Sequence, residues 1–281
     1  MTPLTFTLAV LGISAAAGVL GALLGLGGGI IVVPALTLLL GVDIRYAIGA
    51  SIVSVIATSS GAAAAYVRER MTNLRVAMLL EIGTTAGALS GAFLSGVVGG
   101  RWLFIVFGVV LGFSALQMFR RSAHDEGGAP PVPDPWADRL RLHGEYFDQA
   151  IGKTIPYRVC HTPIGLVLMY LAGIASGLLG IGSGSLKVTA MDLAMRLPIK
   201  VSTATSNLMI GVTAAASAGV YFARGDIDPF VAAPVAAGVL GGATIGSLLL
   251  GRLKSRSVRA VFVVVLLIVS VQMLWKGIAW K

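Results

Sequence analysis

The chain of 281 residues is 56% hydrophobic and 12% charged, with a mean hydropathy of +0.90. Soluble domains carry about 25% charged residues, so this composition excludes a soluble protein and predicts an all-α integral membrane protein. The net charge of +9 does not indicate a nucleic-acid partner, because the basic residues of membrane proteins collect in cytoplasmic loops.

The first apolar run, from Leu4 to Leu40, contains no charged residue and is interrupted by Gly25-Leu-Gly-Gly-Gly29. As one straight helix it would be about 55 Å long at 1.5 Å per residue, whereas the hydrocarbon core of a bilayer is about 30 Å thick. Glycine also costs roughly 1 kcal/mol per position in a helix interior. We therefore expect a re-entrant or hairpin break, whose free backbone groups face protein or a water-filled cavity.

Three spans are expected next, at residues 47–67, 76–98 and 102–119, with basic turns between them. Residues 120–161 break the pattern. Gly127 to Pro135 is linker-like, and Trp136 to Tyr146 is expected to form a short surface helix, a strand pair on the membrane face or an interaction loop. The predicted organisation is a first transmembrane repeat (1–119), a cytoplasmic linker loop (120–161) and a second transmembrane repeat (162–281).

The second half repeats the first. An offset that places Gly25 on Gly180 aligns residues 18–118 with the second half without a gap. It also pairs Tyr66 with Tyr221 and Gln117 with Gln272. Such agreement predicts an internal repeat, as in many transporters. Each repeat would hold a glycine-broken first segment followed by three spanning helices, which makes five elements, and an odd number inverts the second repeat.

The distribution of basic residues supports the inverted arrangement. With five elements per repeat, fifteen lysines and arginines fall on one side of the membrane and five on the other, with Lys187 set aside as intramembrane. Four full spans per repeat would give twelve against eight. Basic residues concentrate on the cytoplasmic side, so both termini are predicted to be periplasmic and the 120–161 loop cytoplasmic.

The glycine breaks are the predicted site for an anion, because a helix N-terminus carries partial positive charge and free N–H donors. Lys187 follows the second break, and a lysine within a membrane segment is a candidate functional residue. It could instead reach the interface or pair with Asp192. The hydroxyl faces of the following helices could equally mediate helix packing. The predicted substrate-binding residues are Gly27, Gly28, Gly29, Ser51, Gly182, Ser183, Gly184, Ser185, Lys187, Ser206 and Asn207.

Glu81 is a candidate for proton coupling, because carboxylates within membranes serve as proton relays. The aligned residue of the second repeat is Ala236, so this role would be asymmetric. A pairing with a basic loop residue is the alternative. The glycines at 83, 87 and 91, with those at 238, 242 and 246, form small-xxx-small patterns that predict close helix packing.

The sequence indicates no enzyme. It has no Walker loop and no H-E-x-x-H motif, and no catalytic residue, metal site or cofactor is predicted. The single cysteine, Cys160, excludes an intramolecular disulfide. The three histidines lie within 120–161 at a spacing that fits no metal motif.

The stretch Leu24-Gly-Leu-Gly-Gly-Gly-Ile-Ile-Val-Val-Pro34, its counterpart in the second half and the Gln-Met tail pattern resemble the TauE/SafE family of sulfite and organosulfonate exporters. The second half departs from the first at Ser183, in the place of Gly28, and at Thr189, in the place of Pro34. The resemblance implies a multi-pass carrier of the bacterial inner membrane that moves small sulfur-containing anions such as sulfite or sulfoacetate.

The first hypothesis is therefore a secondary transporter that exports such an anion by alternating access, with the lipid bilayer and the anion as its partners. An anion channel on the same scaffold is one alternative. A membrane scaffold or regulatory subunit that acts through the 120–161 loop is another. A homo-oligomer is compatible with each.

Overall fold

The computed structural model describes residues 2–24, 28–68, 72–120, 133–148, 152–250 and 255–279. The first half contains five helices, which confirm the spans expected from the sequence to within about three residues. They are α1 (Pro3–Leu24), α2 (Gly29–Leu39), α3 (Ile44–Arg68), α4 (Leu74–Val97) and α5 (Gly100–Arg120). The second half contains α7 (Thr162–Leu179), α8 (Gly184–Thr189), the π-helical turn η2 (Ala190–Ala194), α9 (Ile199–Ala223), α10 (Pro229–Leu250) and α11 (Ser255–Ile278).

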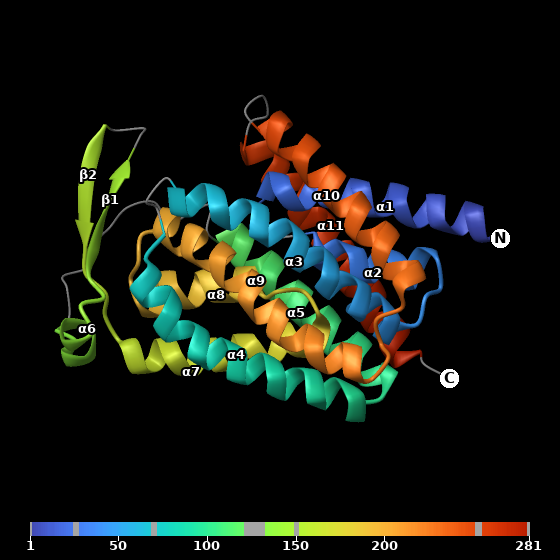
Figure 1. Cartoon of the computed structure of the whole chain (residues 1–281), viewed down its shortest axis with the longest axis horizontal. Helices are drawn as coiled ribbons and strands as arrows, with labels where there is room; N and C mark the ends of the chain where they lie inside the picture. The colour runs from blue at the N-terminus through green and yellow to red at the C-terminus, as the bar shows by residue number, and fades with distance from the viewer. Residues whose placement is uncertain are drawn as a thin grey trace.

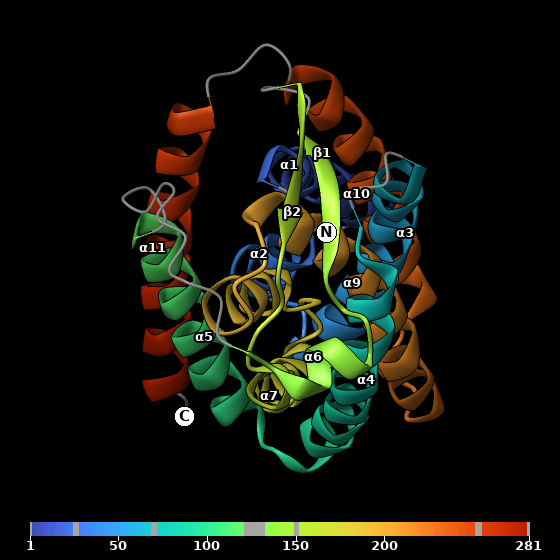
Figure 2. The same ribbon diagram turned by 90° about the vertical axis from the view of Figure 1, so that its left-hand side faces the viewer.

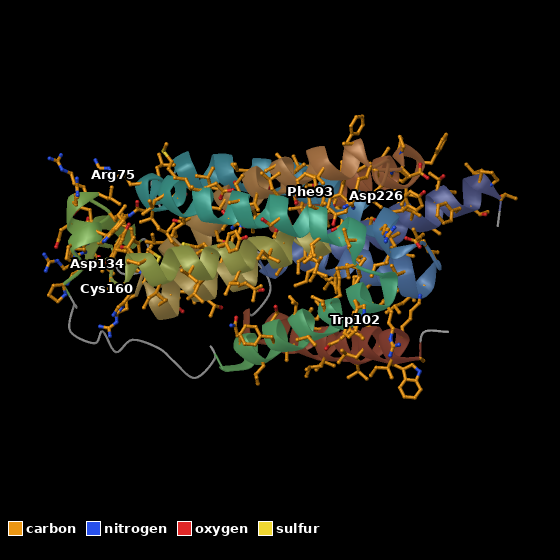
Figure 3. All side chains as sticks on the ribbon, turned by 90° about the horizontal axis from the view of Figure 1, so that it is seen from below. Arg75, Phe93, Trp102, Asp134, Cys160 and Asp226 are labelled. Atoms are coloured by element: carbon orange, nitrogen blue, oxygen red, sulfur yellow. The ribbon has the colours of Figure 1, made fainter. Side chains whose placement is uncertain are left out.

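The helices have the length and surface of a membrane bundle. Six of them are long and apolar enough to cross a bilayer within the described ranges. Large apolar side chains remain exposed along them, including Val97 and Phe230, each 84% exposed, as expected where lipid is the solvent. Trp136 and Trp102 are both more than half exposed, and Trp102 lies away from the end of the bundle that holds Asp134 (Figure 3). The headgroup region of a bilayer favours such tryptophans.

Both chain ends lie at one end of the bundle, and the connection between the two halves lies at the opposite end (Figure 1). The helices pack in pairs that join the two halves. Helix α1 packs on α10 and α4 packs on α7, while α3 crosses α9 and α5 lies beside α11. Figure 2 shows the α5–α11 pair along one flank. The two halves are therefore interleaved within one bundle.

Glycines set the close approach within these pairs, as predicted. A Cβ at Gly87 of α4 would overlap the carbonyl oxygen of Tyr170 on α7. A Cβ at Gly242 of α10 would overlap that of Ala15 on α1, and one at Gly238 would lie 2.5 Å from that of Leu11. Only a hydrogen in place of the side chain allows the two backbones to come so near.

The connection between the halves forms a small folded unit, which departs from the all-α prediction. It contains α6 (Pro135–Arg139) and an antiparallel hairpin of β1 (Gly144–Asp148) and β2 (Lys153–Tyr157). The surface helix predicted from Trp136 is present, and the strand pair that was its alternative follows it and extends beyond Tyr146. The predicted linker-like stretch lies outside the described residues as far as residue 132.

This unit is fixed to the bundle by polar contacts. The buried carboxylate of Asp134 accepts hydrogen bonds from the first turn of α6 and, at 2.7 Å, from both the N–H and the hydroxyl of Thr162 at the start of α7. The side-chain amide of Asn73, which caps α4, donates to the carbonyl of Leu142 and to the hydroxyl of Tyr157. The unit therefore moves with the beginnings of α4 and α7.

Candidate functional site

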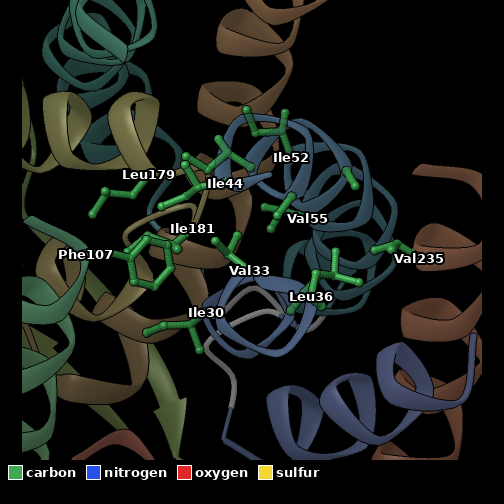
Figure 4. Close-up of a cluster of buried hydrophobic side chains, with 14 of the residues drawn as sticks. Ile30, Val33, Leu36, Ile44, Ile52, Val55, Phe107, Leu179, Ile181 and Val235 are labelled. Atoms are coloured by element: carbon green, nitrogen blue, oxygen red, sulfur yellow. The ribbon is translucent and has the colours of Figure 1, made fainter. Parts of the chain in front are cut away.

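The two glycine breaks meet inside the bundle. The hydroxyl of Ser51 on α3 donates to the carbonyl of Gly180 at 2.8 Å and lies 3.3 Å from the carbonyl of Gly29. Apolar side chains fill the crossing, where Ile30, Ile181 and Phe107 point toward one another (Figure 4). The structure thus brings together segments that the sequence placed in separate repeats. Gly27, also predicted for this site, lies outside the described residues.

The second break contains strained backbone and an unsatisfied hydroxyl. Gly180 ends α7 with a φ of +65°, Gly182 has +70°, and Ser183 has +47°, a value that non-glycine residues seldom adopt. Ser183 is 2% exposed, and its hydroxyl has no hydrogen-bond partner among the described residues. A buried polar group without a partner costs roughly 1–3 kcal/mol. A bound ligand that accepts a hydrogen bond from this hydroxyl would remove that cost.

Lys187 is connected to Glu81 through one hydroxyl. Lys187 is fully buried, and its Nζ donates to Thr213 Oγ1 on α9 at 2.6 Å. The same Thr213 Oγ1 lies 2.7 Å from Glu81 Oε1 on α4, toward which it donates. Glu81 Oε1 also accepts from the hydroxyl of Thr85 at 3.0 Å, while Oε2 is buried without a partner among the described residues. The two charged residues singled out in the sequence therefore belong to one network.

The remaining predicted residues are distributed around the second break. The hydroxyl of Ser206 donates to the carbonyl of Gly184 at 3.3 Å, the same contact that Ser51 makes to Gly29 in the first half. Ser185 and Ser114 of α5 share a 3.0 Å hydrogen bond. Asn207, which follows Ser206 on α9, is buried, with 6% of the residue exposed. Gly28 and Gly182 lie at the breaks themselves.

The sequence did not single out α5 as part of this region. Ser114 contacts Ser185, and Gln117 accepts a hydrogen bond from Thr189. Both are spaced one helical turn apart on α5, within a span that otherwise looks apolar. The sequence signal for Gln117 is the Gln-Met pair, which recurs at the end of each repeat and marks the repeat. Thr213 was noted only as part of a hydroxyl face.

The arrangement provides one cation and several unused donors in a buried place. Lys187 has three N–H donors, of which one is used. The Ser183 hydroxyl adds a neutral donor that no described residue occupies, and Asn207 adds a buried side-chain amide. A buried cation with free donors is suited to binding an anion, because the anion supplies both the opposite charge and the missing acceptors.

Comparison with known proteins indicates a membrane transporter. Over 96% of its length this chain is 27% identical to a protein of Bacillus subtilis named "Probable membrane transporter protein YunE", of which it covers 97%. It is 27% identical over 91% of its length to a "Probable membrane transporter protein" of Xylella fastidiosa, of which it covers 90%. No solved structure matches the chain significantly. The family model described as "Sulfite exporter TauE/SafE" matches residues 10–273, and the chain therefore belongs to this family of multi-pass membrane transporters.

Proposed function

We propose that this protein is a secondary transporter that exports a small sulfur-containing oxyanion, sulfite or an organosulfonate such as sulfoacetate, across the bacterial inner membrane. The observation that carries the proposal is Lys187, a fully buried lysine directly after a glycine break within the bundle. A charged side chain inside the membrane is costly and marks an ion or substrate pathway. Membership of the sulfite exporter family supports the substrate class.

The proposed anion site lies at the second break and extends to the first. Lys187 would provide the charge, and Ser183 would donate a hydrogen bond from a hydroxyl that has no partner among the described residues. The buried amide of Asn207 would be a further donor. Ser185 and Ser206 lie beside them, and Gly182 and Gly184 form the backbone of the break, where Gly182 packs against Ile210. Gly28, Gly29 and Ser51, and Gly27 by its place in the sequence, would complete the wall on the first break. Three or more donors around one lysine suit the oxygens of a sulfite or sulfonate group.

Alternating access is proposed from the relationship between the two halves. Helices α2, α3, α4 and α5 begin at Gly29, Ile44, Leu74 and Gly100, and the offset that places Gly25 on Gly180 carries these onto the first residues of α8, α9, α10 and α11. The same shift exchanges the pair α1–α10 with α7–α4. Two inverted repeats (1–119 and 162–281) joined by a cytoplasmic loop (120–161) account for this pattern, with both termini in the periplasm.

A carrier is favoured over a channel because the crossing of the breaks is packed. Ile30, Ile181 and Phe107 are each at most 3% exposed there. An ion that crosses must wait for these side chains to separate, and a pseudo-symmetric pair of repeats can open the site to each side in turn.

Transport by purified protein in liposomes tests the proposal. Wild type should accumulate labelled sulfite or sulfoacetate with saturable kinetics and should show counterflow, which a channel does not. Lys187→Met should abolish transport, and Ser183→Ala should weaken it. Lys276→Met, which removes a lysine bonded to the Thr37 carbonyl at the far end of α2, and Ser217→Ala, whose hydroxyl bonds only its own helix, are the matched controls. Full activity of Lys187→Met would reject this site.

A further inference from the structure

The hydrogen bonds that link Lys187 to Glu81 bear on how anion transport is coupled to protons. Such coupling rests on the proposed anion site. We propose that the oxyanion and a proton bind together, the anion at Lys187 and the proton on Glu81, so that this transporter moves its anion with a proton rather than against one. Thr213 is the positioning residue that connects the two events.

Lys187 cannot balance the charges of both Glu81 and a bound anion. With Glu81 ionised, Lys187 already has a counter-ion one hydroxyl away, since the two hydrogen bonds through Thr213 Oγ1 are 2.6 and 2.7 Å long. An oxyanion that joins this pair leaves one uncompensated negative charge in a buried place, which is strongly unfavourable. Once Glu81 takes up a proton, its carboxyl is neutral, and Lys187 balances one charge of the anion, which is the full charge of a monovalent sulfonate. Ionised Glu81 and the oxyanion therefore compete for one cation.

Thr213 can report the state of Glu81 to Lys187 without moving. Its hydroxyl has one hydrogen and two acceptors within reach, both at 2.7 Å, which are Glu81 Oε1 and the carbonyl of Met209. While Glu81 is ionised the hydrogen points to the carboxylate. When Glu81 is protonated the hydrogen can turn to Met209, and the threonine oxygen then accepts from the carboxylic acid. Lys187 thereby loses its link to a negative charge and is available to the ligand.

The surroundings of Glu81 are consistent with a carboxyl that takes up and releases a proton. Its Oε2 is buried and has no partner among the described residues, so a proton can be taken up on Oε1, facing Thr213, without Oε2 losing a hydrogen bond to those residues. Glu81 is seven residues into α4 from Leu74, about 10 Å along the helix, on the end of the bundle that holds the hairpin. A path for the proton from that end is therefore short.

Glu81 is the carboxyl that Thr213 links to Lys187. Helix α7, which packs along α4, has no charged residue, and its Tyr170 hydroxyl contacts Ser90 further along. On α9, Lys200 and Tyr221 lie about 20 Å and 12 Å along the helix from Thr213. The titratable groups of α4 and of the described segments around it include Arg75, Glu81, Arg141, Tyr157, Tyr170, Lys187, Asp192, Lys200, Tyr221 and Arg224.

Joint movement of the proton and the anion determines which gradients can drive transport. A proton that travels with the anion does not drive export when the outside is acidic, because it must then leave against its own gradient. Export would follow the concentration gradient of the substrate, and an acidic exterior would drive uptake instead. A proton antiporter requires the opposite relation, in which proton and anion exclude each other from the site.

The test measures proton uptake on ligand binding. Purified protein in weak buffer with a pH-sensitive dye is titrated with sulfoacetate, whose sulfonate and carboxylate are both ionised between about pH 6 and pH 8. Wild type should take up close to one proton per anion bound, and its Kd should rise with pH by up to about tenfold per unit. Glu81→Gln should bind the anion with no proton uptake and with a Kd independent of pH. Thr84→Val, a neighbouring buried threonine that bonds only its own helix, should behave as wild type.

The outcomes separate this inference from the proposed function. Binding to wild type without proton uptake, or with proton release, overturns the inference and leaves the anion site intact. Failure of wild type to bind sulfite or sulfoacetate at all overturns both. In liposomes, an acidic exterior should accelerate sulfoacetate uptake by wild type and should have no effect on Glu81→Gln. Retained acceleration in Glu81→Gln would place the proton elsewhere and reject the role of this residue.

Discussion

The hydroxyl of Ser51 on α3 donates a 2.8 Å hydrogen bond to the backbone carbonyl of Gly180, which belongs to the other half of the chain. Replacement by alanine leaves this buried carbonyl without its partner. Ser51→Ala should lower the free energy of unfolding by about 0.6 kcal/mol, the average for side-chain hydrogen bonds between membrane helices. Chemical denaturation in mild detergent measures it, with Ser217→Ala, whose hydroxyl bonds carbonyls of its own helix, as the control. An unchanged stability would mean that the two breaks are held together by apolar packing alone.

The close approach of α1 and α10 depends on Gly242 but not on its neighbour Gly241. A Cβ at Gly242 would overlap the carbonyl oxygen of Ala15, whereas a Cβ at Gly241 meets nothing within 4 Å. Gly242→Ala should therefore separate the helices and destabilise the protein by about 1–3 kcal/mol. Gly241→Ala should be neutral or slightly stabilising, because alanine favours the helix. Thermal unfolding of the two variants, which differ only in position, checks the pair. Equal stabilities would show that the helices have room to adjust.

The sequence predicted the fold more completely than the site. Long uncharged runs and the ungapped repeat were enough to place the five helices of the first half, because lipid-length helices are governed by hydropathy alone. The hairpin of β1 and β2 was only one of three possibilities, since it forms through contacts with Asn73 and other residues distant in sequence. Within the site, Lys187 and Glu81 were noted as rare charges. Their connection through Thr213 depends on the crossing of α4, α8 and α9, which no local pattern encodes.

Tyr221 joins α9 to the last turn of α7. Its hydroxyl, fully buried, donates to the carbonyl of Gly177 at 2.7 Å and lies 3.3 Å from that of Leu178. Helix ends leave carbonyls without intrahelical partners, and a buried one without a donor costs roughly 1–3 kcal/mol. Tyr221→Phe should therefore destabilise the protein by about this amount. Tyr170→Phe, which removes an exposed hydroxyl bonded to Ser90, should change little. A neutral Tyr221→Phe would indicate that these carbonyls have another donor.

Asp134 fixes the connecting unit to α7, and its carboxyl makes this attachment dependent on pH. Burial alone raises the pKa of Asp134, but the hydrogen bonds from the side chain and backbone of Thr162 and from the N–H groups of Ala137 and Trp136 outweigh it, so the pKa lies below 3.8. Because the pKa is lower in the folded protein than in the unfolded chain, where it is about 3.9, the ionised carboxylate stabilises the fold above that value. The stabilisation is lost as the pH falls through the lower, folded value.

Asp134→Asn tests this contact. An amide has only one oxygen that can accept hydrogen bonds, so its NH₂ group would face either the donors of Thr162 or those of α6. We expect the free energy of unfolding to fall by about 1–3 kcal/mol at neutral pH. The difference in stability between wild type and variant should shrink as the pH falls through the lowered pKa of Asp134, since wild type then loses its own charge. Melting temperatures measured from pH 7 down to about pH 2.5 give both quantities, with Asp138→Asn as the control, because Asp138 is exposed and pairs only with His143. A gap that stays constant with pH would show that the geometry of Asp134, and not its charge, holds the unit in place.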